Sequence, residues 1–558
     1  MRTFFDRIRH LFIVALGVIT GYSANAQLGV PKETFTRADT LRGSNTSPFR
    51  TCYDINYYHL DIKFDIADKS ISGNVLFKFT ATTDFTKLQF DLFSNLVIQK
   101  VVYKGQELPY TREYNAVFVT FPNTIPRDSK QEFTVYYGGH PTIAKRAPWD
   151  GGIVYTTDSL GNPWVATACQ GMGASVWWPN KDQQADEVDS ALISISCPDT
   201  LQDVSNGRLR KVKKLGNGYT RYDWFVANPI NNYDIEANIG KYSHFGEVFD
   251  GEKGKLTMDY WVLTYDLPKA KRQFPVNARD MLKAFEYWFG PYPFYEDGYK
   301  LIEAPHLGME HQSGTAYGNH FLNGYLGRDL SGTGWGLKWD FIIVHESGHE
   351  WFGNNITSKD LADMWIHESF TNYSESLFVE QRYGKRAGQE YVNGTRSRIQ
   401  NDSPIVGVYG VNKEGSGDMY YKGGNLMNML RTIINDDEKW RSILRGLNKT
   451  FYHQTVTYDD IVNYVTDKAG IDLKPIFEQY LKTTHLPILE FMFINGKLNC
   501  RWIADVKNFN MPVRVRIKGG EYQFIKPGTQ FRPVSLEGAT RDNIEVDTFD
   551  YYIGVLVD

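Results

Sequence analysis

The spacing of apolar residues changes twice along this chain of 558 residues, and the two changes separate regions that must fold differently. From about Tyr57 to Phe245, apolar and polar residues alternate with the period of two that is typical of half-buried strands. His59–Ile66 alternates in this way, and Ser72–Thr80 follows after a turn around Ala67. Similar runs recur farther along, at Lys87–Leu92, Ala116–Thr120, Glu132–Tyr137 and Ala191–Cys197. The pattern predicts an all-β region.

Helical spacing replaces the alternation after Asp266. Lys269–Phe289 is predicted to be a helix because Gly-Pro-Tyr-Pro follows it as a stop signal. Two strongly helical segments then lie close together, Leu337–Phe352 and Leu361–Tyr383, each followed by glycine. Further helices are predicted at Lys422–Asn435, Trp440–Phe451, Tyr458–Ala469 and Leu473–Leu481, and strand patterns return after Leu486.

A chain of this length is too long for one hydrophobic core, so several domains are expected. We predict a multidomain α+β fold with an N-terminal β-sandwich-like domain over residues 27–247. A mainly helical domain would cover residues 248–485, and a small β-sandwich-like domain would cover residues 486–558.

The first 26 residues have the pattern of a signal peptide. Arg2, Arg7 and Arg9 precede the apolar run Leu11–Tyr22, and Ala24-Asn-Ala is a cleavage signal. The apolar run is shorter than the roughly 20 residues that span a bilayer, and we expect no transmembrane segment in the mature chain. The prediction is therefore export to the periplasm or the exterior.

Composition excludes some classes of function. Lys and Arg number 61 and Asp and Glu 65, so the net charge of −4 offers no basic surplus for nucleic acid. The four cysteines form no C-x-x-C pair and no disulfide framework, and they are predicted to be inert.

A metal-ligand pattern lies inside the two neighbouring helical segments. His345-Glu-Ser-Gly-His349 places two imidazoles four residues apart, on one face of a helix. Glu368 lies nineteen residues past His349, on the next helix. Two histidines and one glutamate with an open position describe a hydrolytic zinc site, so one Zn²⁺ per chain is predicted. Glu346 lies beside the metal and can act as the general base, taking a proton from the attacking water.

These residues resemble the gluzincin aminopeptidase family, which includes alanyl aminopeptidases and leukotriene hydrolase. The resemblance rests on His345-Glu-x-x-His349, eighteen residues and Glu368, and the expected domain order matches over nearly the whole mature chain. It implies a thermolysin-like catalytic domain at residues 248–485. The large helical domain that many family members carry after the small β-domain is not expected here.

A second motif resembles the family's G-x-M-E-N exopeptidase signature. Gly308-Met309-Glu310-His311 lies upstream of the metal helix. The resemblance implies that Glu310 binds the free α-amine of the substrate, with Gly308 and Met309 beside it. A carboxylate pairs well with an ammonium group, and only an N-terminal residue supplies one. The chain departs from the signature in His311, where the family has Asn, and in Leu307, where it has Gly.

Three further residues are expected near the site. Tyr420-Tyr-Lys-Gly resembles the family's Y-x-K-G motif, whose tyrosine stabilises the oxyanion; Tyr421 is the alternative. Gln170, nine residues before Pro179, resembles the residue that the β-domain lends to the amine site. Glu375 is a candidate partner for a ligand histidine, although a surface role is also open.

The resulting prediction is a zinc-dependent aminopeptidase that hydrolyses the N-terminal bond of peptides with a free N-terminus. The alternatives are a thermolysin-type endopeptidase, which shares the metal motif, and a catalytically silent peptide-binding homologue. The glutamate of the second motif argues against the endopeptidase, and retention of all ligands and the base argues against the silent homologue. The preferred N-terminal residue and the oligomeric state do not follow from the sequence.

Overall fold

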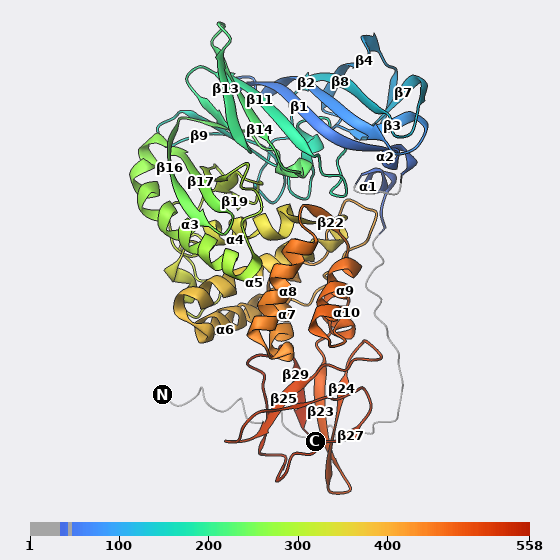
Figure 1. Ribbon diagram of the computed structural model, residues 1–558, viewed down its shortest axis with the longest axis vertical. Coiled ribbons are helices and arrows are strands. Elements are labelled where there is room, and N and C mark those ends of the chain that lie inside the picture. Colours follow the sequence, from blue (N-terminus) through green and yellow to red (C-terminus); the bar gives the residue numbers. More distant parts are fainter. Residues whose placement is uncertain (1–33, 43–46, 558) are drawn as a thin grey trace, which may run out of the picture. The chain divides into compact units, whose positions relative to one another are not determined.

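The computed structural model describes residues 34–42 and 47–557. Most of the strands precede most of the helices along the chain, as the colours of Figure 1 show. Arg37–Asp558 is a compact unit by itself. The signal peptide predicted for residues 1–26 lies outside the described residues. Among the residues that are described, no helix has both the length and the apolar character needed to cross a bilayer.

Alternating burial builds the N-terminal strands. In β1 (Tyr53–Asp65), Tyr58, Leu60, Ile62 and Phe64 are fully buried, and the residues between them are partly exposed. β1 pairs with β2 antiparallel and with β11 parallel. The eight-stranded sheet contains, in order, β13 (Arg208–Lys214), β14 (Tyr219–Val226), β11 (Ser190–Pro198), β1, β2 (Ser70–Ala81), β8 (Lys130–Gly139), β4 (Leu96–Tyr103) and β5 (Gln106–Glu107).

Two smaller sheets and two short helices complete this region. The sheets are β3 (Phe85–Asp91), β7 (Ala116–Ile125) and β6 (Tyr110–Glu113), and β12 (Gln202–Val204), β15 (Asn238–Gly240), β10 (Pro163–Ala168) and β9 (Gly152–Thr157). The helices are α1 (Arg37–Leu41) and α2 (Pro48–Thr51).

A five-stranded sheet connects the strands to the helices. Its order is β16 (Tyr242–Gly251), β17 (Gly254–Leu263), β18 (Tyr299–Glu303), β20 (Thr315–Tyr317) and β19 (Gly308–Met309). Helix α3 (Leu267–Phe289) contacts β16 and β17. The predicted boundary between residues 247 and 248 falls inside β16, so the sheet that supports the helices begins earlier, at Tyr242.

The two predicted metal helices are present but shorter than expected. α4 covers Phe341–Gly348 instead of 337–352, because Trp339 is extended and Phe352 and Gly353 leave helical geometry. α5 covers Trp365–Tyr383 after a short 3₁₀ turn at Leu361–Asp363. The remaining helices are α6 (Lys385–Gly394), α7 (Tyr421–Ile434), α8 (Asp437–Thr450), α9 (Tyr458–Ala469) and α10 (Lys474–Lys482), and β21 (Ile356–Ser358) pairs with β22 (Gln454–Val456).

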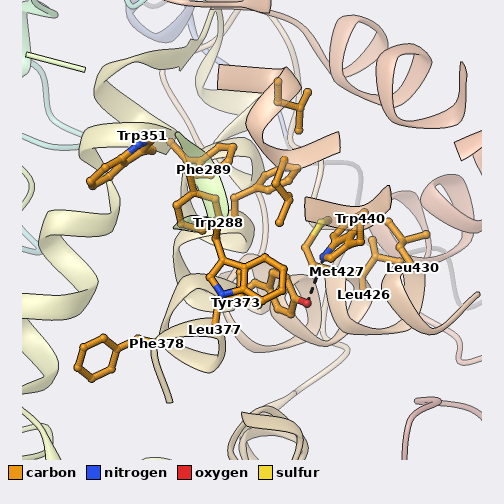
Figure 2. Close-up of a cluster of buried hydrophobic side chains, with 14 of the residues drawn as sticks. Trp288, Phe289, Trp351, Tyr373, Leu377, Phe378, Leu426, Met427, Leu430 and Trp440 are labelled. Carbon is orange, nitrogen blue, oxygen red and sulfur yellow. Dashed lines mark hydrogen bonds between the residues drawn. The ribbon is translucent and has the colours of Figure 1, made fainter. Parts of the chain in front are cut away.

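Large apolar side chains fix these helices against one another (Figure 2). Trp440 of α8 donates a hydrogen bond from Nε1 to Tyr373 Oη of α5, 3.2 Å away. The same buried cluster continues into the C-terminal strands through residues such as Phe491 and Trp502. These strands are β27 (Arg532–Pro533), β24 (Lys497–Ile503), β23 (Ile488–Ile494) and β29 (Gly554–Val557), and β26 (Gln523–Ile525), β25 (Val513–Ile517) and β28 (Ile544–Val546).

Candidate active site

One cavity of about 350 Å³ collects nearly all the predicted site residues. Its walls include Gln170, Gly308, Glu310, His345, Glu346, His349, Glu368, Tyr420 and Tyr421. Met309 is the exception, because its side chain is buried in the apolar core instead of lining the cavity. Any contribution of Met309 to the site is therefore limited to its backbone.

A glycine lets the two metal helices approach closely. A Cβ atom at Gly348, within the His345–His349 segment, would lie 2.7 Å from Ser374 Oγ and 3.1 Å from Thr371 Cγ2 of α5. Real side chains do not tolerate the shorter contact, so any larger residue would separate α4 from α5. The small residue in the motif thus brings Glu368 to the two imidazoles.

Glu368 lies within reach of both predicted imidazole ligands. Glu368 Oε2 lies 3.4 Å from His349 Nε2 and 3.7 Å from His345 Nε2. Ligand atoms about 2.0–2.2 Å from a tetrahedral zinc ion are separated by roughly 3.4 Å, so these distances fit a shared ion. Among the described residues, Glu368 Oε2 is buried without a hydrogen-bond partner of good geometry, and a buried carboxylate oxygen is costly unless a cation or donor satisfies it.

The far sides of both imidazoles are held in place. His345 Nδ1 lies 2.7 Å from Glu375 Oε1, and Glu375 in turn accepts hydrogen bonds from Asn372 Nδ2 and Tyr391 Oη. His349 Nδ1 lies 3.0 Å from the carbonyl oxygen of Phe352. Such contacts orient Nε2 toward the metal position and fix the tautomer. Glu375 is fully buried here, which excludes the surface alternative.

The charge balance of the site favours a cation. Burial alone would lower the pKa of His349, but attraction to Glu368 raises it to about 8. Burial likewise opposes ionisation of His345, yet its bonds with Glu368 and Glu375 raise its pKa well above the usual value. Without a metal, the imidazoles thus carry the positive charge that the surrounding carboxylates require. A divalent ion fits the same donor set.

Glu346 lies in the cavity but has the environment of a base. Burial raises its pKa to about 7, close to the value that suits a group that both takes and returns a proton near neutrality. The backbone of Gly308 lies against it, since a Cβ atom there would be 2.9 Å from Glu346 Oε1. The Gly at position 308 therefore leaves room for the Glu346 carboxylate.

Glu310 lies close to the metal ligands, and its carboxylate is within 4.8 Å of ligand atoms of His349 and Glu368. Gln170 Nε2 donates a hydrogen bond to Glu310 Oε1, and Tyr233 Oη donates another to the same oxygen at 3.2 Å. Gln170 Nε2 also lies 3.4 Å from Glu368 Oε1, so this part of the cavity adjoins the metal ligands directly. Asn354 Nδ2 holds the backbone carbonyl of Glu310 at 2.9 Å. The strand region and the segment after α4 both contribute to placing this carboxylate.

The two candidate tyrosines have different surroundings. Burial and the carboxylates of Glu368, Glu414 and Glu310 raise the pKa of Tyr420 well above its usual value, so its hydroxyl stays protonated as a donor. The charged groups that influence Tyr421 are instead Glu375 and Arg398. The surroundings favour Tyr420 as the donor at the metal position.

Glycines at the start of α7 allow this placement of Tyr420. A Cβ atom at Gly423 would lie 1.9 Å from Ser369 Oγ of α5. Ser369 Oγ also donates a hydrogen bond of 2.7 Å to the carbonyl oxygen of Met419, the residue before Tyr420. The glycine of the Lys-Gly pair after the tyrosines is therefore required by helix packing.

Three residues in or beside the cavity carry no signal in the sequence. Tyr233 contacts Glu310 from far along the chain, and Trp149 stands at the cavity rim with 66% of its surface exposed. Glu414 lines the cavity, where burial and then repulsion from Glu368 and Glu310 raise its pKa to about 7.

His367, adjacent to Glu368, is structural: its Nε2 accepts a hydrogen bond from Ser358 N. All four cysteines are buried and unpaired.

Comparison with known proteins agrees with this site. Residues 278–480, which contain both metal helices, match the family model of the Peptidase family M1 domain. The chain is 22% identical to a leucyl aminopeptidase of Saccharolobus solfataricus over 55% of this chain and 40% of that protein. It is 23% identical to human aminopeptidase B, over 68% of this chain and 58% of that protein. The chain spans between 20% and 58% of the length of the curated relatives it matches.

Solved structures show the same fold. The crystal structure of an M1 zinc metallopeptidase from Deinococcus radiodurans superposes with a TM-score of 0.68 at 18% identity, covering 80% of this chain and 98% of that one. A variant of the same protein bound to a Tyr-Ser-Ala substrate gives 0.67. The fold is thus multidomain α+β, similar to that of an M1 metallopeptidase, and the chain's resemblance to the gluzincin aminopeptidase family is confirmed.

Proposed function

We propose that this protein is a zinc-dependent aminopeptidase, a hydrolase that removes N-terminal residues from peptides. The observation that carries the proposal is the pairing of two walls in one cavity. His345, His349 and Glu368 form a metal-binding set, and Glu310 with Gln170 lies beside them in the same cavity. The names of the relatives, which are aminopeptidases, support the same reaction class.

The metal site is assigned to His345, His349 and Glu368. A bound zinc ion supplies Lewis acidity that polarises a carbonyl and acidifies a water molecule. Glu346 takes a proton from the attacking water and returns one to the leaving amine. The protonated hydroxyl of Tyr420 donates a hydrogen bond to the negative charge that develops on the carbonyl oxygen.

Glu310 sets where the peptide is cut. Its carboxylate pairs with the α-ammonium of the substrate, and Gln170 and Tyr233 hold that carboxylate in position. Because Glu310 lies close to the metal ligands in the same cavity as Glu346, the bond next to the N-terminal residue reaches Glu346. A free N-terminus is therefore a requirement for binding, which separates this proposal from a thermolysin-type endopeptidase.

Two features of the protein stay predictions. Export through the signal peptide at residues 1–26 rests on Arg2, Arg7, Arg9 and the apolar run that follows. The division into a β-sandwich-like domain, a thermolysin-like domain and a small β-domain rests on the periodicity changes and on the segregation of strands from helices.

The experiment is to incubate the purified protein with a peptide of defined sequence and identify the products by mass spectrometry. Successive release of N-terminal residues, lost on chelation and restored by zinc, is the expected result. His349→Ala should lack stoichiometric zinc and show no turnover. Internal cleavage products would favour the endopeptidase, and a zinc-loaded protein without any turnover would favour the silent homologue.

A further inference from the structure

A strained turn follows Glu310 immediately. Gly314 N donates a hydrogen bond of 3.0 Å to the carbonyl oxygen of His311, which closes a turn over His311–Gly314. Ser313 has a φ of +54°, in the left-handed region that residues with a Cβ atom rarely adopt. The turn is completely buried. A strained, buried turn persists only where its surroundings determine it strongly.

Hydrogen bonds from two regions of the chain hold the turn. Gly207 N donates a hydrogen bond of 2.9 Å to Ser313 Oγ, and Asn206 Nδ2 donates one of 2.8 Å to the carbonyl oxygen of Gln312. From the other side, Ser313 N donates to Glu350 Oε1 at 2.8 Å, directly after the metal helix. The turn therefore lies between the strand region and the segment that follows His349.

A buried ion pair occupies the inside of the turn. His311 Nδ1 lies 2.7 Å from Glu236 Oε2, and neither side chain is exposed at all. A Cβ atom at Gly314 would lie 2.2 Å from Glu236 Oε1, so the carboxylate fills the space that the glycine leaves. Neither ring nitrogen of His311 makes a hydrogen bond of good geometry among residues 34–42 and 47–557, although Nδ1 approaches Glu236 Oε2 closely. This short distance is the contact that joins the ring to Glu236.

Glu236 belongs to the same short segment as Tyr233, whose hydroxyl contacts the Glu310 carboxylate. Residues 233–236 therefore fix Glu310 twice: Tyr233 holds its side chain, and Glu236 holds the turn behind its backbone. We propose that the Glu236–His311 ion pair positions Glu310 and so sets the selectivity of the site for a free α-amine. Both are positioning residues, and the inference rests on the proposed function.

The test separates amine recognition from metal binding. The probes are the hydroxamate of the amino acid that the wild type cleaves fastest and the same hydroxamate without its amine. Both bind through the hydroxamate, so the ratio of their inhibition constants reports the amine contact alone. Glu236→Gln and His311→Asn should each reduce this ratio about tenfold, because losing one partner leaves a buried charge uncompensated and the turn relaxes. KM for free-amine peptides should rise about tenfold with kcat changed less than about threefold.

The double variant Glu236→Gln, His311→Asn completes a thermodynamic cycle. The two residues act through one shared contact, so its loss in the ratio should be smaller than the product of the two single losses. His306→Asn is the matched control: His306 is also buried, its ring nitrogens lack partners among the described residues, and its ring centroid lies 6.5 Å from that of His311. The ratio should be unchanged in this control.

A fall in melting temperature with an unchanged ratio would show that the pair is only structural and would overturn the inference. If the single variants do not fold, the double variant decides by itself, and a wild-type ratio there would also overturn the inference. A wild type that does not discriminate between the two hydroxamates would contradict the proposed aminopeptidase instead.

Discussion

The two walls of the cavity are built in different ways. The metal wall comes from two consecutive helices, α4 and α5, and its three ligands lie within 24 residues of sequence. The amine wall brings together Gln170, Tyr233 and Glu310, and the first and last of these are 140 residues apart. Helix packing alone sets the geometry of the first wall, whereas the second depends on the strand region docking against the helices. We therefore expect substitutions away from the site to change the selectivity for a free α-amine more easily than they change zinc binding and kcat.

The largest effect should come from the metal wall. Glu346→Gln keeps the shape of the side chain but cannot take the proton from water, so kcat should fall by roughly 10²–10⁴-fold. Zinc content should match that of the wild type, because Glu346 is not a ligand in this account. Metal analysis of the same preparation checks this, and loss of zinc together with activity would mean that Glu346 belongs to the ligand set.

The next effect concerns Tyr420. Tyr420→Phe removes the donor to the oxyanion and should reduce kcat by about 10²–10³-fold with little change in KM. Tyr421→Phe is the matched control, since its hydroxyl faces Glu375 and Arg398, and it should stay within about threefold of the wild type. The opposite ranking of the two variants would reassign the donor.

Helix approach gives a smaller effect on the metal wall. Gly348→Ala places a Cβ atom 2.7 Å from Ser374 Oγ and forces α4 away from α5. Overpacking of this kind costs about 1–3 kcal/mol, so zinc affinity should fall roughly tenfold. Adding Ser374→Ala removes the clashing oxygen and should restore part of the affinity in a zinc titration. Unchanged affinity in Gly348→Ala would show that Gly348 is not what brings the helices together.

The smallest effect is expected where the strand region contacts the helical region, at Glu187 and Thr357. Glu187 accepts a hydrogen bond from Thr357 Oγ1, and burial raises its pKa from 4.5 to about 8. The folded protein then holds a proton that the unfolded chain releases, so stability falls as pH rises from about 4.5 to about 8. The melting temperature of the wild type should fall between these two pH values, and in Glu187→Gln this fall should be smaller by a few °C. An identical pH dependence in the variant would exclude Glu187 as its source.

The sequence predicts the metal wall better than the amine wall, because the metal wall is local in sequence and the amine wall is not. His345, His349 and Glu368 follow from helical spacing, and α9 begins and ends at the predicted residues. α6 escaped detection because Lys385–Gly394 is short and polar with an internal glycine, and its packing against α5 stabilises it. Tyr233 and Glu236 lie in a short 3₁₀ segment and the residues after it, and they act on Glu310 through contacts far apart in sequence. Spacing carries no information about such contacts.

The central claim is that the amine wall makes this protein an exopeptidase. The most direct measurement compares kcat/KM for a peptide and its N-acetylated form in the wild type and in Glu310→Ala. Losing one member of a buried charge pair costs roughly 2–5 kcal/mol, so the wild type should cleave the acetylated peptide at least tens of times more slowly. Glu310→Ala should lower the rate for the free peptide strongly and for the acetylated peptide little. Comparable rates for both peptides in the wild type, with internal cleavage, would contradict the account.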